Sequence, residues 1–367
     1  MPEANTLYSE EVLVDRLFGS AIGAMEMLSV YVGERLGLYQ ALQTAGPSTT
    51  AELAARADVQ PHLLREWLEQ QTVSGFLAVD DSGSAAPRFS LPAEHSEVFT
   101  NPDSLSVMTP FARFLVGVAY PLPALLDAFR TGGGVPYGDY GVDLREGQAE
   151  FTRPMFVQLL GQEWLPALPE VHARLQADPP ARVADVASGG GLSSIAIARA
   201  YPQVRVDGID LDAPSIDLAK SYLTDSERDV QDRVTFIHGD AADPALAHQY
   251  DLVTIFEALH DMARPVEVLS ACRELLAPGG AVLIGDERVG ETFTGEGDDM
   301  ERLLYLFSVL HCLPSRLADG TDDAPSLGTG AVMRAPTVRA YAEAAGFSQF
   351  QVTPIENDFW RFYLLRV

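Results

Sequence analysis

The residues best suited to bind a nucleoside lie around a glycine turn at positions 182–191, Arg-Val-Ala-Asp-Val-Ala-Ser-Gly-Gly-Gly. A β-branched apolar run ends there, and residues 192–201 then have the pattern of a helix. Glycine lets the backbone approach a ligand where a Cβ atom would clash. A second strand-like run, 204–209, ends at Asp210, 19 residues after Gly191. That spacing places a carboxylate against ribose hydroxyls in a doubly wound sheet, so the sequence predicts a nucleoside-type ligand.

A histidine that could act as a general base follows another strand-like run, 250–256. The residues directly after it are Glu257-Ala258-Leu259-His260-Asp261-Met262. An unperturbed histidine titrates near about pH 6.5, so it can take up a proton at neutral pH. His260 also follows the carboxyl end of a strand, where such sheets place their ligands. A structural or substrate-orienting histidine is the alternative.

Strands and helices alternate from residue 180 onward, which predicts a mostly parallel sheet. We expect seven strands, near 182–187, 204–209, 233–238, 250–256, 281–286, 350–353 and 359–366. The last two form a closing hairpin. The predicted fold class is therefore α/β, a Rossmann-like seven-stranded sheet preceded by an all-α, winged-helix domain.

The first 100 residues have the pattern of a winged helix. Thr49 or Thr50 can cap one short helix, and a second begins at Pro61 and ends near Thr72. Two short strands, 75–79 and 88–91, then flank a polar loop. Residues 9–43 repeat apolar side chains at helical spacing, a face that would bury against another helix or a second subunit. A homodimer is the prediction.

The charge balance argues against nucleic acid and anionic membranes as partners. The net charge is −27, and residues 1–100 hold five arginines and fourteen acidic residues. Both kinds of partner require a basic surface. A small molecule is the expected partner, although a ligand-responsive winged-helix regulator remains an alternative.

Residues 101–178 are expected to form a helical connector. A glycine-rich run, 131–141, interrupts it and could be a flexible lid, with Tyr137 and Tyr140 as contacts, or a plain loop. The predicted domains are thus 1–100 for winged helix and dimerisation, 101–178 for connector and lid, and 179–367 for cofactor binding.

Cysteine use and hydropathy point to the cytoplasm. Cys272 and Cys312 are the two cysteines, and no metal-ligand spacing surrounds them, so no metal is expected. The acidic N-terminus does not have the pattern of a signal peptide. No apolar stretch reaches the roughly 18–20 residues that span a bilayer.

The glycine turn resembles the first motif of class I S-adenosylmethionine-dependent methyltransferases, and the chain as a whole resembles bacterial small-molecule members with an N-terminal winged helix. The matching positions are Asp185, Ala187, Ser188, Gly189 and Gly191. The family has glycine where this chain has Ala187, a change that the turn tolerates if the φ angle there is negative. By this resemblance, the loop backbone contacts the amino-acid end of the cofactor.

The resemblance implies further cofactor residues at the ends of the next three strands. Asp210 binds the ribose, Asp240 accepts from the adenine amino group, and the Ala241 N–H donates to the base. The remaining residues implied in cofactor binding are Leu211, Gly239, Phe256 and Glu257.

Residues 260–262 resemble the His-Asp-Trp segment of small-molecule O-methyltransferases, with Met262 in place of tryptophan. The resemblance implies that His260 is the general base, with Asp261 beside it, and that Asp286 orients it. Because neighbouring strand residues point to opposite faces, we expect only one of Asp286 and Glu287 to face the site. Candidate acceptor contacts are Tyr137, Phe156 and His311.

The predicted function is methyl transfer from S-adenosylmethionine to a small, partly apolar acceptor, favouring a hydroxyl, with S-adenosylhomocysteine as product. Cyclisation or rearrangement using the same cofactor is an alternative, which the departures at Ala187 and Met262 keep open. The sequence does not identify the acceptor or the atom that is methylated.

Overall fold

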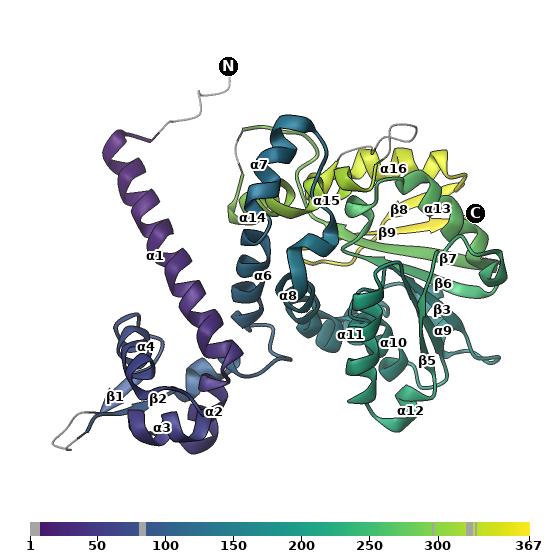
Figure 1. Cartoon of the computed structure of the whole chain (residues 1–367). Helices are drawn as coiled ribbons and strands as arrows, with labels where there is room; N and C mark the ends of the chain where they lie inside the picture. The colour runs from purple at the N-terminus through teal and green to yellow at the C-terminus, as the bar shows by residue number, and fades with distance from the viewer. Residues whose placement is uncertain (1–7, 81–85, 296, 321–325, 327–328) are drawn as a thin grey trace. The chain divides into compact units, whose positions relative to one another are not determined.

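The chain folds into two compact units. Figure 1 shows the computed structural model, which describes residues 8–80, 86–295, 297–320, 326 and 329–367. One unit comprises residues 1–117 and 146–154, and the other comprises 118–145 and 155–367. The polar loop expected between the wing strands lies mostly outside the described residues. The three-part division of the chain stays a prediction.

The first unit has the expected winged-helix elements. Its helices and strands are α1 (Glu10–Arg35), α2 (Leu38–Ala45), α3 (Thr50–Ala57), α4 (Pro61–Val73), β1 (Ala78–Asp80), β2 (Arg88–Ser90), α5 (Ser96–Phe99) and α6 (Thr109–Ala119). Thr49 caps α3 in a capping box with Glu52, and Pro61 opens α4. The helical pattern over 9–43 divides into two helices at Gly37, whose φ of +65° ends the first.

A seven-stranded sheet forms the centre of the second unit, as predicted. Its strands run in the order β5-β4-β3-β6-β7-β9-β8. Their bounds are β3 (Arg182–Val186), β4 (Arg205–Asp210), β5 (Val234–His238), β6 (Tyr250–Phe256), β7 (Leu276–Glu287), β8 (Gln349–Val352) and β9 (Trp360–Arg366). The five strands from β5 to β7 are parallel, and β9 and β8 pair antiparallel. The β7 strand starts before the predicted residue 281, with a register shift where it pairs with β6.

The helices that accompany this sheet are α7 (Leu122–Thr131), α8 (Gly141–Met155, shared with the first unit), a π-helix (Phe156–Trp164), α9 (Pro169–Gln176), α10 (Leu192–Ala200), α11 (Ala213–Thr224), α12 (Arg228–Gln231), α13 (Pro265–Leu275), α14 (Asp299–Phe307), a second π-helix (Ser308–Cys312), α15 (Leu313–Ala318) and α16 (Ala335–Ala344). The first π-helix and α9 to α12 pack on one face of the sheet, and α13 and α16 pack on the other. Within the described residues, no single helix is long and apolar enough to cross a membrane; only the bent pair α6 and α7 meets that criterion together.

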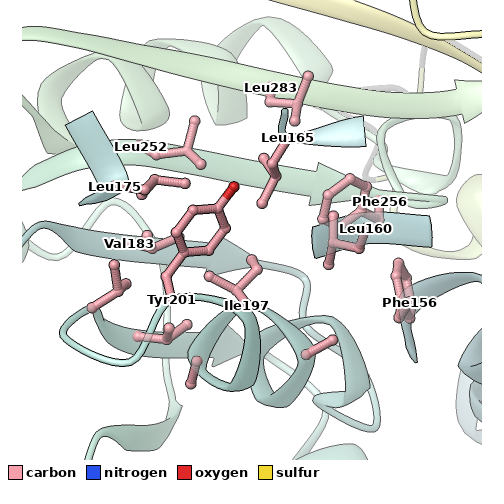
Figure 2. Packing of buried hydrophobic residues seen from close by; sticks show 14 of the residues in the cluster. Phe156, Leu160, Leu165, Leu175, Val183, Ile197, Tyr201, Leu252, Phe256 and Leu283 are labelled. Atoms are coloured by element: carbon pink, nitrogen blue, oxygen red, sulfur yellow. The ribbon is translucent and has the colours of Figure 1, made fainter. Parts of the chain in front are cut away.

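Alternate residues of each strand supply two separate cores. Val183 and Leu283 face a cluster with α9, α10 and the first π-helix, whereas their neighbours Ala184 and Ile284 face a cluster with α13 and α16. Figure 2 shows the first cluster, in which the Tyr201 ring lies among aliphatic side chains. The Tyr201 hydroxyl lies 2.8 Å from His172 Nδ1. The parallel strands are thereby fixed from both sides, so their carboxyl ends form one stable edge.

Candidate functional site

The turn between β3 and α10 adopts the left-handed conformation at three positions. The φ angles are +55° at Ala187, +52° at Gly189 and +70° at Gly191. The condition under which the turn would tolerate Ala187, a negative φ, is therefore not met, because the chain must reverse from strand to helix within these few residues. An alanine in this region is strained relative to glycine.

Asp185 holds the turn together from within the core. Its side chain is buried and accepts hydrogen bonds from Ser193 Oγ (2.5 Å), Ser194 Oγ (2.7 Å) and Thr254 Oγ1 (2.7 Å). Burial raises the pKa of Asp185, and these hydroxyls oppose the rise. The carboxylate thus ties the ends of β3 and β6 to the start of α10, and its proposed contact with the cofactor stays a prediction.

Asp210 lies at the end of β4 and faces the glycine turn. Its two carboxylate oxygens accept from the backbone N–H groups of Gly189 and Asp212, each at 2.8 Å. Burial raises its pKa, although the two backbone bonds oppose this. The next residue, Leu211, is 71% exposed. The carboxylate is therefore held rigidly beside the turn, as a ribose ligand would need to be.

The end of β5 lies beside the end of β4. The Gly239 N–H donates to the Asp210 carbonyl at 3.0 Å, and Asp240 is exposed and accepts from the Ala242 N–H at 2.9 Å. Ala241 is buried. The three strand ends that the sequence assigns to the cofactor therefore lie side by side, because β5, β4 and β3 are neighbours in the sheet.

The residues of this edge fit an adenosyl cofactor. A Cβ atom added at Gly189 would meet nothing within 4 Å, so the backbone is open on that side. The Ser188 hydroxyl is buried and has no hydrogen-bond partner among the described residues. A buried hydroxyl of this kind carries a free-energy cost that a bound ligand would remove.

His260 lies on a 3-10 turn, η5 (Leu259–Asp261), just after β6, and is 1% exposed. Its Nδ1 atom is 2.9 Å from Asp286 Oδ1 and 2.8 Å from Glu287 Oε2. Asp261 Oδ1 lies 3.2 Å from the other ring nitrogen, Nε2. The expectation that only one of Asp286 and Glu287 faces the site is wrong, because both side chains bring a carboxylate oxygen within 2.9 Å of the same ring nitrogen.

The carboxylates around His260 set its protonation. Burial by itself lowers the His260 pKa, but Asp261, Glu287 and Asp286 outweigh it and raise the pKa well above its ordinary value. Burial raises the pKa of Glu287 to about 8, and the pKa of the half-buried Glu257, whose φ is +52°, is raised too. Asp286 is held below its ordinary pKa by His260, against the effect of burial. The surrounding carboxylates therefore favour the protonated imidazole, so His260 differs from the unperturbed histidine assumed from the sequence.

The glycine-rich segment packs against the second π-helix and α15. The Val135 N–H donates to Pro314 O at 2.9 Å, and the Tyr140 hydroxyl donates to Leu310 O at 3.0 Å. The Tyr140 ring meets His311 edge-on, with centroids 4.6 Å apart. Tyr137 lies 5.8 Å from the same imidazole, whose pKa burial lowers to about 4. Two of the predicted acceptor contacts, Tyr137 and His311, therefore lie together.

Phe156 and Phe256 belong to an aromatic cluster in the first core. Their ring centroids are 5.4 Å apart, and Phe256 stacks on Trp360 at 6.1 Å. Both phenylalanines are buried. Their predicted roles, acceptor contact for Phe156 and cofactor contact for Phe256, stay predictions.

Sequence reasoning did not identify several polar residues of this region. Arg145 makes a two-point ion pair with Asp212 (2.7 Å and 3.3 Å), which in turn caps α11. The Tyr137 ring lies over the Arg145 guanidinium. The hydroxyl partners of Asp185 were also missed: Gly191, not a serine, is the N-cap of α10, so no capping signal marked Ser193 and Ser194.

The comparisons with known proteins agree with this geometry. A methyltransferase-domain model matches residues 184–282, and a model of the Rv2258c-like winged HTH domain matches residues 24–101. The predicted resemblance is therefore confirmed over these two segments: a methyltransferase-domain match follows a winged-helix match in the chain.

Curated relatives match part of the chain. The ubiquinone biosynthesis O-methyltransferase of Nitrosospira multiformis is 39% identical over 111 residues, which are 30% of this chain and 44% of that protein. Its counterpart from Marinobacter nauticus is 38% identical over 103 residues, 28% of this chain and 42% of that protein. The chain thus spans less than half the length of these relatives.

Solved structures match nearly the whole length of the chain. Human N-acetylserotonin methyltransferase in complex with S-adenosylmethionine has a TM-score of 0.66 at 19% identity, covering 99% of both chains. The mitomycin 7-O-methyltransferase has 0.63 at 20%, covering 97% of this chain and 99% of that one. The N,N-8-amino-8-demethyl-D-riboflavin dimethyltransferase from Streptomyces davawensis has a TM-score of 0.60 at 22% identity, covering 96% of this chain and 98% of that one. These likenesses confirm the predicted fold, which both O- and N-methyltransferases share.

Proposed function

We propose that the protein transfers a methyl group from S-adenosylmethionine to a hydroxyl of a small, partly apolar acceptor, with His260 as general base. The observation that carries this proposal is the Asp286–His260 hydrogen bond at the carboxyl edge of the sheet. A carboxylate on Nδ1 fixes the ring and its tautomer, leaving Nε2 as the nitrogen that exchanges a proton with the acceptor.

The cofactor supplies an activated methyl group. We assign its adenosyl part to the glycine turn, Asp210 and the β5 end, with the proposed contacts Asp185, Ala187, Ser188, Gly189, Gly191, Asp210, Leu211, Gly239, Asp240, Ala241, Phe256 and Glu257. The protein aligns the acceptor, excludes water and accepts one proton at His260 Nε2. Alignment alone is worth several kcal/mol, and general-base assistance about 10²–10⁴-fold in rate.

Asp261 and the Tyr137–His311 pair are proposed to line the acceptor side, with Phe156 as a further acceptor contact. Asp261 borders Nε2, and its pKa is held below the ordinary value by His260, against the effect of burial. The carboxylate can therefore stabilise the imidazolium that forms when His260 takes the proton from the acceptor. The names of relatives include O-methyltransferases, which favours oxygen as the methylated atom.

The test is turnover with a panel of small phenols and alcohols, followed by mass spectrometry of both S-adenosylhomocysteine and methylated acceptor. We expect His260→Gln to lower kcat by about 10²–10⁴-fold while S-adenosylhomocysteine affinity stays at the wild-type level. His62→Gln, at an exposed position of α4, is the control. Full turnover in His260→Gln would refute the base assignment, and conversion of an acceptor without S-adenosylhomocysteine would indicate cyclisation or rearrangement.

A separate measurement distinguishes the enzyme from a winged-helix regulator. On α4, the second helix of the winged-helix pattern, Arg65 lies 3.8 Å from Glu69, so its charge is already partnered within the helix. Phosphate binding needs uncompensated cations. We therefore expect no binding of duplex DNA in fluorescence anisotropy at moderate salt; micromolar binding would favour the regulator.

We also propose that the protein is a homodimer paired through α1. Along this 26-residue helix the large apolar side chains are exposed, among them Val14 (59%), Leu17 (61%), Phe18 (69%) and Met25 (67%). Such a continuous apolar face is unusual on a monomer and indicates an interaction surface. A second copy is the partner we assign, because α1 presents the same face along its whole length. Location in the cytoplasm stays a prediction from the sequence.

A further inference from the structure

A buried arginine lies directly behind the proposed base. Arg316, on α15, is 0% exposed. A guanidinium is costly to bury unless its N–H groups and its charge are matched by partners. The partners that the fold supplies therefore indicate what the residue does.

The Arg316 side chain joins three separate segments. Its Nη1 donates to the His260 carbonyl at 2.8 Å and to Thr329 Oγ1, while Nε donates to Ser326 Oγ at 3.2 Å. The η5 turn uses other carbonyls for its own bonds, since Asp261 N donates to Ala258 O. The His260 carbonyl is thus bound by a side chain from a distant helix.

His260 is consequently held at three points. Asp286 accepts from its ring Nδ1 at 2.9 Å and from its backbone N–H at 3.3 Å. Arg316 fixes the carbonyl on the other side of the same residue. A single turn of 3-10 helix has little rigidity of its own, so these external bonds determine where the imidazole lies.

The charge of Arg316 also acts on this cluster. The guanidinium interacts electrostatically with Asp261 and Asp286, two of the carboxylates that favour the imidazolium. A cation in this position opposes them. The charged or titratable groups around the imidazole thus come from several segments of the chain. They are Glu257 after β6, Asp261 on η5, Asp286 and Glu287 on β7, His311 and Cys312 on the second π-helix, and Arg316 on α15.

We propose that Arg316 is a positioning residue for His260, which fixes the backbone of the proposed base through its carbonyl. The proposal rests on the proposed function, but it concerns the imidazole itself, which can be observed without any acceptor. Lysine cannot replace the fork of donors that joins the carbonyl, Thr329 and Ser326, although it keeps the charge.

The experiment follows the imidazole by NMR in full-length protein labelled with ¹⁵N-histidine, with His260→Gln to assign the signals. In Arg316→Met we expect the proton affinity of His260 to rise about tenfold, because a neighbouring cation is lost. In Arg316→Lys we expect the proton affinity to stay within about threefold of wild type, while the Nδ1–H signal broadens because the ring is less fixed. S-adenosylhomocysteine affinity should be unchanged in both.

Arg174→Met is the matched control, since it removes a two-point ion pair with Asp251 at the opposite end of β6. It should leave the His260 titration as in wild type. Folded Arg316→Lys and Arg316→Met proteins with a wild-type titration and a sharp Nδ1–H signal would overturn the proposal.

Thr329→Val and Ser326→Ala decide the question if both Arg316 variants fail to fold. Each removes one partner of the guanidinium and should broaden the same signal; a wild-type spectrum in both overturns the proposal. Because these readouts need no turnover, absence of methyl transfer would leave the positioning result standing, and the two failures can be told apart.

Discussion

The proposed role of His260 places two opposing demands on one buried imidazole. A general base must be free of its proton when the acceptor arrives, yet the carboxylates on both sides of this ring favour the imidazolium. The Arg316 guanidinium acts in the opposite direction, and a sulfonium bound at the proposed site would do the same, since like charge disfavours the protonated ring. Under this proposal, the ligand-free protein is the state in which His260 should be most protonated.

Protonation of His260 and Glu287 predicts how stability depends on pH. Both pKa values are higher in the folded chain than in the unfolded one, where they are 6.5 and 4.5. The folded state therefore holds protons that unfolding releases, so the free energy of unfolding falls as pH rises from 6.5 to about 8. Urea unfolding at pH 6, 7 and 8 measures this. Glu287→Gln, which mimics the protonated carboxyl, should show a weaker decline; an unchanged slope would contradict the shifted pKa.

Ala187 provides a test of backbone strain in the cofactor turn. Its φ of +55° favours glycine, so Ala187→Gly should raise the free energy of unfolding by about 0.5–1 kcal/mol after the entropy cost of glycine. The control is Ala184→Gly in β3, a buried strand position that should lose stability instead. Urea unfolding of both variants decides the matter, and equal losses would exclude strain at Ala187.

At the scale of elements, the close packing of α10 against β4 and β5 determines how near the glycine turn comes to the sheet edge. A Cβ atom at Gly191 would lie 2.2 Å from the Phe236 ring of β5, and one at Gly208 would lie 2.6 Å from the same ring. Phe236 thus occupies the space that the two glycines leave. Asp185 accepts hydrogen bonds from the two serine hydroxyls at the start of α10 and so ties this helix to β3. The turn, the helix and the sheet therefore form one rigid unit.

Gly191→Ala and Gly189→Ala separate steric crowding from backbone strain. Both positions have positive φ, but only Gly191 has a close neighbour in the described structure. We expect Gly191→Ala to lose about 1–3 kcal/mol more stability than Gly189→Ala. Thermal unfolding with calorimetry measures both. Phe236→Leu should recover part of the loss in the Gly191 variant, and no recovery would mean that Phe236 is not the obstacle.

At the scale of the whole molecule, the exposed face of α1 predicts the oligomeric state. The protomer mass is 39.7 kDa, and the wild type should elute with light-scattering mass of about twice that value. Replacing Val14 and Phe18 by glutamate should give monomers, because both side chains are exposed in the protomer and their loss costs it little. The control is a variant in which His62 and Leu63, two exposed residues of α4, are replaced by glutamate. A monomeric wild type would contradict the assignment.

The sequence predicted the sheet and the glycine turn well because each is encoded locally. Strand runs of apolar residues, the turn glycines and the acidic residue at the end of β4 each lie within a few positions of one another. The φ of Ala187 could not be predicted, because it depends on the path of the whole turn, which alanine at that position does not reveal. The Asp286–Glu287 pair was misjudged because strand alternation alone does not determine how far two neighbouring carboxylates reach at the end of a strand.

The long-range partners could not be read from the sequence. Arg316 lies 56 positions from His260, and Arg145 lies 67 positions from Asp212. An arginine 0% exposed has no local signal that distinguishes it from a surface arginine. Such pairs depend on how α15 and the start of α8 come to the sheet, which follows from packing rather than from any short motif.

Under the proposed function, the acidic surroundings of His260 would also affect the balance between fresh and spent cofactor. Methyl transfer converts a positively charged sulfonium into a neutral thioether, so the two forms would differ by one charge near a titrating imidazole. A protonated ring would repel the fresh donor and not the by-product, whereas around a neutral ring the carboxylates would attract the donor. Alkaline conditions should therefore weaken product inhibition, and acid should make the enzyme retain its own by-product.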